Sequence, residues 1–179
     1  MNDMLYKAEI QHNEKTIQNL FRTQYYAFGK VRIIMRFLAG FVMIVTAAAV
    51  SLPLWVKGLM LLAGAWLVST PDFPANMRAD KVLQARKNNL PTMHYEFFDD
   101  SMKVSGEGSM TIAYGKITLL VHDDDYLYLF LDKNSVCMMY ADKELMNFLE
   151  TKTGLKFTRQ KSLLAMNIDD LKRIIHPLP

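Results

Sequence analysis

The fold is decided by an apolar stretch, FLAGFVMIVTAAAVSLPLWVKGLMLLAGAWLVS, at residues 37–69, in which Lys57 is the one charged residue. Its first half, residues 37–56, carries no charge, and about 20 such residues suffice to cross the hydrocarbon core of a bilayer. Its second half, residues 58–71, is shorter. It reaches spanning length if the helix begins before Lys57 and this lysine extends its ammonium group to the lipid headgroups. We therefore predict a transmembrane helical hairpin over residues 33–71.

Two other interpretations of the stretch are weaker. A core helix of a soluble protein normally shows one polar face, and the run from Leu38 to Val45 shows none. A cleavable signal peptide would lie nearer the N-terminus and would end in a small-residue cleavage pattern. We therefore expect the hairpin to persist in the mature protein as a membrane anchor.

The charges that flank the hairpin predict its orientation. Basic residues lie just outside both of its ends, whereas Lys57 is the one basic residue in the turn at residues 51–57. Positive charge favours the cytoplasmic side of a membrane. We therefore predict a multi-pass protein of the cell (inner) membrane with both termini in the cytoplasm. The residues that set this topology are Lys30, Arg32, Arg36, Arg78 and Lys81.

Small residues occur in both halves of the hairpin, where they permit close contact between helices. Gly40 and residues 47–49 lie in the first half, and Gly58 and residues 63–65 lie in the second. The simple interpretation is that the two halves pack against each other. A homo-oligomer that assembles through the same faces is the alternative.

Three further segments surround the hairpin, and all are predicted to be cytoplasmic. Residues 1–32 contain a short strand and an amphipathic helix capped by Asn13, with Gly29 as the joint to the first crossing. Residues 72–91 have the composition of a juxtamembrane helix.

The last segment, residues 92–179, alternates short strands with turn signals, followed by a helix that Asp142 caps and Gly154 ends. The predicted fold class is therefore α+β. It combines a two-helix transmembrane hairpin with a small antiparallel sheet closed by a helix.

No catalytic, cofactor or metal site is predicted. The four histidines lack metal-ligand spacing, and Cys137 stands alone on a strand, where it resembles a small buried hydrophobe. The run at residues 123–125 is acidic but lacks the glycine and distal glutamate of a calcium loop, and such runs are typical of solvated turns. We therefore expect that the protein is not an enzyme. A net charge of +3 is too small to indicate a nucleic-acid partner.

Basic residues gather again near the C-terminus, at Lys152, Lys156, Arg159 and Lys161. Close to a cytoplasmic leaflet, each such charge contributes about 1 kcal/mol of attraction to anionic lipid. We predict that these side chains contact lipid headgroups, with an ordinary solvated face as the alternative.

The order of these elements resembles the YcxB-like family of small bacterial membrane proteins. The local matches are a strand, acidic turn and strand at residues 97–104, the segment at residues 112–117, and the strand that begins at Tyr126. The family often has Pro-Lys before its last helix, where this chain has residues 140–143 instead. The resemblance implies a membrane-tethered cytoplasmic domain similar in shape to pleckstrin-homology-like modules, and it implies no activity.

These observations predict a membrane-anchored protein that presents a small binding or sensory domain at the inner leaflet. The alternative is a structural or regulatory subunit of a larger membrane complex that assembles through the hairpin. The expected partners are the lipid bilayer and an unidentified membrane or cytoplasmic protein. No cofactor is expected.

Overall fold

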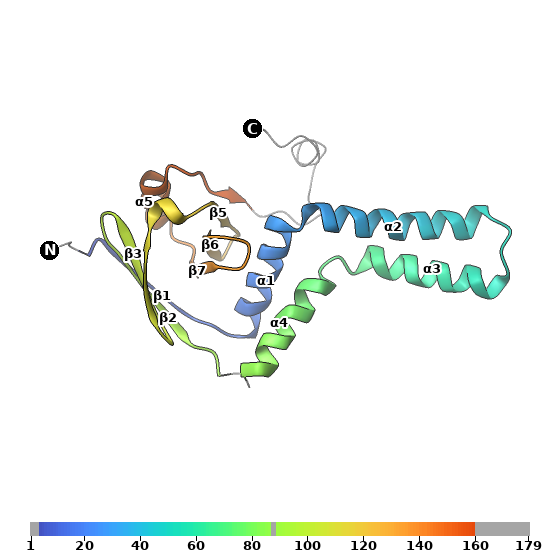
Figure 1. The fold of residues 1–179 in the computed structure, drawn as a ribbon, viewed down its shortest axis with the longest axis horizontal. Helices are drawn as coiled ribbons and strands as arrows, with labels where there is room; N and C mark the ends of the chain where they lie inside the picture. The colour runs from blue at the N-terminus through green and yellow to red at the C-terminus, as the bar shows by residue number, and fades with distance from the viewer. Residues whose placement is uncertain (1–3, 87–88, 160–179) are drawn as a thin grey trace.

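The computed structural model describes residues 4–86 and 89–159 of the chain, which form a mixed α+β fold with a long helical hairpin (Figure 1). The elements follow one another in the order β1 (Tyr6–Gln11), α1 (Glu14–Phe28), α2 (Lys30–Ala49), α3 (Leu54–Ser69), α4 (Phe73–Arg86), β2 (Thr92–Phe97), β3 (Ser101–Ser105), β4 (Ser109–Ala113), the short 3-10 helix η1 (Tyr114–Lys116), β5 (Leu119–His122), β6 (Tyr126–Phe130), β7 (Val136–Tyr140), α5 (Lys143–Thr153) and β8 (Thr158–Arg159).

The strands form two four-stranded sheets, so the prediction of one antiparallel sheet is wrong. Their orders are β1-β2-β3-β4 and β7-β6-β5-β8, and β8 pairs with β5 in parallel. Short strands show which residues face a core, but they do not show which strands pair, because every antiparallel pair offers the same backbone groups. We call the two sheets with α5 the β-domain.

The first strand of the β-domain lies far from its partner in the sequence. β1 pairs with β2 from Tyr6 opposite Phe97 to Gln11 opposite Thr92. In the sequence, all the helices from α1 to α4 therefore come between two strands that are neighbours in one sheet. The described residues of the N-terminal segment (4–32) and of the C-terminal segment (92–159) therefore share this sheet and one core.

The core of the β-domain combines aromatic and aliphatic side chains. Every residue of β6 is buried, as the alternation of leucine and aromatic residues in this strand predicts. Helix α5 covers the core with Phe148, whose ring centroid lies 4.9 Å from that of Tyr6 and 6.2 Å from that of Phe97. The prediction that a helix closes the sheet is confirmed for this part of the fold.

The predicted helix boundaries at α1 and α5 are confirmed. The side chain of Asn13 accepts a hydrogen bond from the backbone of Thr16, whose hydroxyl in turn accepts one from the backbone of Asn13. Asp142 caps α5 in a similar way, and Gly154 ends α5 with φ 70°, a left-handed conformation that favours glycine. Helix α4 begins at Phe73, within the segment 72–91 that the sequence predicts as a juxtamembrane helix.

The α2–α3 hairpin projects away from the β-domain (Figure 1). α2, with 20 residues, is long and apolar enough to cross a membrane by itself. α3, with 16 residues, is long enough only together with α4, and the two helices are bent by 69° relative to each other. By length and composition, the described residues contain one helix that could cross a membrane, or two if the bent pair is one span.

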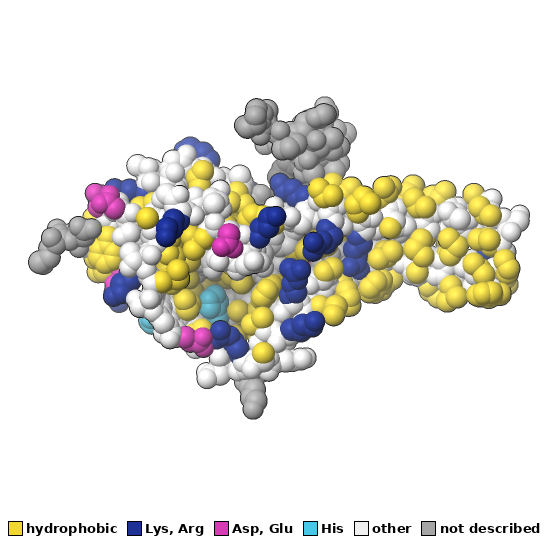
Figure 2. Space-filling model, viewed as in Figure 1, with side chains coloured by type: hydrophobic (Ala, Val, Ile, Leu, Met, Phe, Trp, Pro, Cys, Tyr) yellow, Lys and Arg dark blue, Asp and Glu magenta, His cyan; other side chains and the backbone are white. Residues whose placement is uncertain are grey.

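Apolar side chains cover the outside of the hairpin (Figure 2). Only 17% of the apolar part of α2 is buried, whereas a core helix of a soluble protein would be mostly buried. On α3, Leu54 is 86% exposed and Leu62 is 71% exposed. A surface of this kind is stable in contact with lipid or another apolar partner.

Candidate functional site

The candidate site lies at the base of the hairpin, where the chain passes from α1 into α2 across Gly29. A Cβ atom added at Gly29 would lie 2.5 Å from the carbonyl oxygen of Tyr25. A larger residue would therefore push the start of α2 away from the end of α1. This confirms Gly29 as the joint between the two helices.

Arg36 joins α2 to the bend between α3 and α4. Its guanidinium donates a hydrogen bond of 3.1 Å to the hydroxyl of Thr70 and lies 4.9 Å from the ring centroid of Trp66 and 5.8 Å from that of Phe73. A planar guanidinium can stack on aromatic rings and donate hydrogen bonds at the same time. Arg36 was predicted from the sequence as a topology-setting charge, and the structure gives it this packing role as well.

Asp72 joins the same bend to α1. Its carboxylate accepts a hydrogen bond from the hydroxyl of Tyr26 and lies 3.1 Å from Nε of Arg22. Burial raises the pKa of Tyr26, and the hydrogen bond to Asp72 raises it further. The hydroxyl of Tyr26 therefore stays protonated and donates its hydrogen bond at neutral pH, and the contact fixes the α3–α4 bend against α1.

A pocket of about 440 Å³ opens beside this joint, and we call it the basal pocket. Three cationic side chains line it, and they come from three separate elements: Arg32 from α2, Arg78 from α4, and Lys133 from the turn between β6 and β7. The other lining residues are Gln24, Tyr25, Phe28, Gly29, Val31 and Asn134. None of the described lining residues is acidic.

The three cations of the basal pocket have no acidic partner on the described chain. The ion pairs formed within residues 4–86 and 89–159 involve neither Arg32 nor Arg78 nor Lys133. Three like charges at one pocket repel one another, and a bound anion would relieve this repulsion. The electrostatics of the basal pocket therefore favour a negatively charged ligand.

The turn that carries Lys133 is held in place by its neighbours. The side-chain amide of Gln24 donates a hydrogen bond to the carbonyl oxygen of Lys133, which ties the turn to α1. The adjacent Asp132 accepts hydrogen bonds from the backbone of Asn134 and from the backbone and hydroxyl of Ser135. The hydrogen bond from the backbone of Asn134 lowers the pKa of Asp132 the most, and the two hydrogen bonds from Ser135 lower it further. The carboxylate of Asp132 is thus engaged within its own turn.

The residues that are predicted to set the topology lie around the base of the hairpin. Lys30 and Arg32 are exposed in the first turn of α2, and Arg78 and Lys81 are exposed on α4. Lys and Arg side chains gather there on the face shown in Figure 2. Lys133 was not identified from the sequence, because a lysine in a β-turn carries no signal that it will meet α1 and α4.

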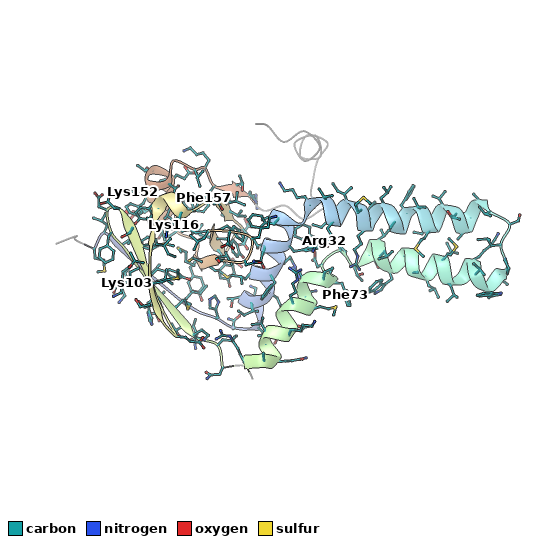
Figure 3. The ribbon with its side chains drawn as sticks, in the orientation of Figure 1. Arg32, Phe73, Lys103, Lys116, Lys152 and Phe157 are labelled. Atoms are coloured by element: carbon teal, nitrogen blue, oxygen red, sulfur yellow. The ribbon has the colours of Figure 1, made fainter. Side chains whose placement is uncertain are left out.

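The predicted basic cluster near the C-terminus is not one shared patch of free charge. Lys152 pairs with Asp99, Lys156 with Glu150 and Arg159 with Asp124. Lys161 lies outside the described residues. Figure 3 shows Lys152 at the end of the β-domain remote from the hairpin, whereas Arg32 and Phe73 lie at the base of the hairpin. The neighbouring carboxylates offset the attraction of these three cations for anionic lipid.

The acidic run at residues 123–125 is used within the fold. Asp123 accepts hydrogen bonds from the backbone of Tyr126 and the hydroxyl of Tyr128, while Asp124 pairs with Arg159 and Asp125 with Lys15. No group of three metal-ligating side chains occurs among the residues that the structure describes. These contacts agree with a turn that stabilises the β-domain.

Cys137 lies buried on β7, and burial raises the pKa of its thiol to about 12. A thiol with such a pKa is protonated at neutral pH and is a poor nucleophile. The structure therefore places Cys137 in the core.

Comparison of the chain with family models, with curated proteins and with solved structures finds no match. The resemblance to the YcxB-like family therefore stays a prediction.

Proposed function

We propose that this protein is a membrane anchor and binding module, whose α2–α3 hairpin lies in the bilayer and whose β-domain lies against the cytoplasmic leaflet. The observation that carries the proposal is the exposed apolar surface of a hairpin that projects from a well-packed domain. In water this surface would lose about 25 cal/mol of stabilisation for each Å² left uncovered, so it requires an apolar environment.

The dimensions of the hairpin suit a bilayer. A helix rises about 1.5 Å per residue, so α2 is about 30 Å long, close to the thickness of the hydrocarbon core. α3 is about 24 Å long by the same rule, and the chain on either side of it must complete a second crossing. Lys57 lies in the first turn of α3, at the tip of the hairpin, where it can reach lipid headgroups.

The charge distribution supports a cytoplasmic base. Lys30 and Arg32 on α2, and Arg78 and Lys81 on α4, lie at the base, while the tip carries only Lys57. By the positive-inside rule the base faces the cytoplasm. With this orientation the β-domain and the described N-terminal strand are both cytoplasmic.

The topology of the β-domain supports a binding role. β2 to β4 follow one another through short turns, as do β5 to β7, and α5 comes next. We propose that this order corresponds to the pleckstrin-homology-like shape that the resemblance to the YcxB-like family implies. A tethered binding module has a raised effective concentration at the membrane.

Cysteine accessibility in intact cells tests the proposal. The Lys57→Cys variant should react with a membrane-impermeant maleimide from outside the cell, and the Lys116→Cys variant should react only after lysis. The native Cys137 is buried and adds little background. Release of the wild-type protein by an alkaline carbonate wash, or labelling of Lys116→Cys before lysis, would contradict the proposal.

A further inference from the structure

We propose that the basal pocket binds the phosphate of an anionic phospholipid, with one acyl chain of that lipid lying along α2. The inference rests on the proposed membrane anchoring, because a lipid reaches this pocket only if the hairpin lies in the bilayer. The pocket volume of about 440 Å³ falls in the range of about 300–1,000 Å³ that is usual for small-ligand sites.

The side chains of the pocket suit a phosphodiester. Arg32 and Arg78 each present a planar fork of N–H donors, which matches two oxygens of one phosphate, and Lys133 adds a compact positive charge. Since the described lining contains no acidic residue, an anion meets no repulsive partner among these side chains. The amides of Gln24 and Asn134 line the same pocket and suit the hydroxyl groups of a headgroup.

The surface that continues from the pocket identifies a lipid as the source of the phosphate. Val31 lines the pocket, and it begins a line of apolar side chains at helical spacing along α2. Val31 is 71% exposed, Met35 60%, Leu38 51% and Val42 52%. Residues three and four apart lie on one face of a helix, so the four side chains form a continuous stripe that starts at the pocket.

A ligand that fills both features must carry a negative charge at one end and an apolar chain at the other. A free phosphate ion would leave the stripe uncovered, and a soluble acidic peptide would place charges against it. An anionic phospholipid matches both, and its phosphate lies at the depth where the base of the hairpin meets the bilayer. Arg32 lies in the first turn of α2, where the helix dipole also favours an anion.

Native mass spectrometry of the full chain, delipidated in detergent, tests the inference. The protein is titrated with phosphatidylglycerol, with phosphatidylcholine of the same acyl chains, and with sodium phosphate. The pocket variant carries Arg32→Gln, Arg78→Gln and Lys133→Gln. The matched control variant removes the same charge elsewhere in the described fold, through Lys7→Gln, Lys116→Gln and Lys143→Gln.

The expected result is a first phosphatidylglycerol molecule bound alike by the wild type and the control variant, and about 100-fold more weakly by the pocket variant. Phosphatidylcholine should bind weakly to all three proteins, and millimolar phosphate should not displace the bound lipid. Equal weakening in both variants, equal binding of the two lipids, or displacement of the lipid by phosphate would each overturn the inference.

A milder pair of variants decides the matter if the triple variant does not fold. Lys133→Glu and Lys143→Glu each reverse one exposed charge, and only Lys133→Glu should weaken phosphatidylglycerol binding, by more than about tenfold. A wild type that resists the carbonate wash but shows no preference for phosphatidylglycerol would overturn the pocket and leave the anchoring proposal standing. A wild type released by the wash would overturn the anchoring proposal itself.

Discussion

Gly40 of α2 and Gly64 of α3 face each other where the two helices cross. A Cβ atom added at Gly40 would lie 2.9 Å from the carbonyl oxygen of Gly64, and one added at Gly64 would lie 2.8 Å from that of Gly40. The backbones themselves are in contact, so a side chain has no room to move aside. This contact sets the separation of the two helices of the hairpin.

Replacement of Gly40 by alanine should separate α2 from α3. We expect a loss of about 1–3 kcal/mol in the free energy of unfolding, because overpacking at a backbone contact forces a shift of the helix. Thermal unfolding in detergent micelles, followed by circular dichroism, measures the change. Gly58→Ala is the matched control, since nothing lies within 4 Å of a Cβ atom there, and alanine should raise helix stability by about 0.5–1 kcal/mol. Equal effects at both positions would contradict the close-contact argument.

Replacement of Arg36 by lysine should loosen the bend between α3 and α4. Lysine keeps the charge but loses the planar stacking on Trp66 and the directed hydrogen bond to Thr70, a combined loss of about 1–2 kcal/mol. Chemical unfolding followed by tryptophan fluorescence, in a Trp55→Phe background, reports on Trp66. Arg32→Lys is the control and should change stability by less than about 0.5 kcal/mol. An Arg36→Lys protein as stable as this control would show that the contacts of Arg36 contribute nothing.

Replacement of Asp72 by asparagine should weaken the attachment of the bend to α1. The neutral amide no longer attracts Arg22, and it accepts a weaker hydrogen bond from Tyr26. Because Asp72 and Arg22 are both partly exposed, we expect the free energy of unfolding to fall by about 1–2 kcal/mol. Limited proteolysis should cut the variant faster near residue 72. Asp80→Asn changes an exposed carboxylate on the neighbouring helix α4 and should leave the cleavage rate as in the wild type. Equal rates for the two variants would argue against the role of Asp72.

Stability should fall as the pH is lowered through the titration range of His12. Burial, and to a smaller degree the charge of Arg86, lower the pKa of His12 in the folded state below its ordinary value of 6.5. Between these two pKa values the unfolded chain takes up a proton that the folded chain does not, so the free energy of unfolding decreases as pH decreases. The His12→Gln variant should lose this part of the pH dependence, while His94→Gln should retain it. Unfolding curves measured from pH 7.5 to 5 test the difference, and parallel profiles for wild type and His12→Gln would refute it.

Cys137 should react very slowly with maleimide in the folded protein. Its thiol has a pKa of about 12 because it is buried, so almost no thiolate is present at pH 7.5. We expect a labelling rate more than about 100-fold below that of a Lys116→Cys thiol in the same chain. Denaturant should remove the difference, and fast labelling of Cys137 without denaturant would contradict its place in the core.

The sequence predicts well where local chemistry decides the structure. Asn13 and Asp142 cap helices because their side chains reach backbone N–H groups two or three residues away. Gly154 ends α5 because glycine adopts a positive φ without strain. The apolar stretch at residues 37–69 predicts a helical hairpin from composition alone, and the structure forms α2 and α3 over most of it.

The sequence predicts poorly where distant segments meet. Nothing local indicates that β1 pairs with β2 across the whole hairpin, or that the strands divide into two sheets. The basic residues near Lys152 stand close together in the sequence, but each described member pairs with a carboxylate, either from a distant part of the chain or, for Lys156, from six residues away. The positions of charged residues in the sequence do not show which of these charges form ion pairs in the folded protein.

The sequence by itself determined that the chain carries an apolar hairpin with basic residues at its base, because hydrophobicity and net charge are sums over neighbouring residues. Only the tertiary structure decided that Arg32, Arg78 and Lys133 line one pocket. These residues lie on α2, on α4 and in the β6–β7 turn, and α4 and this turn come close to the start of α2 because both contact α1. Local propensities act over a few residues, whereas this pocket depends on contacts between segments about 100 residues apart, such as that between Gln24 and Lys133.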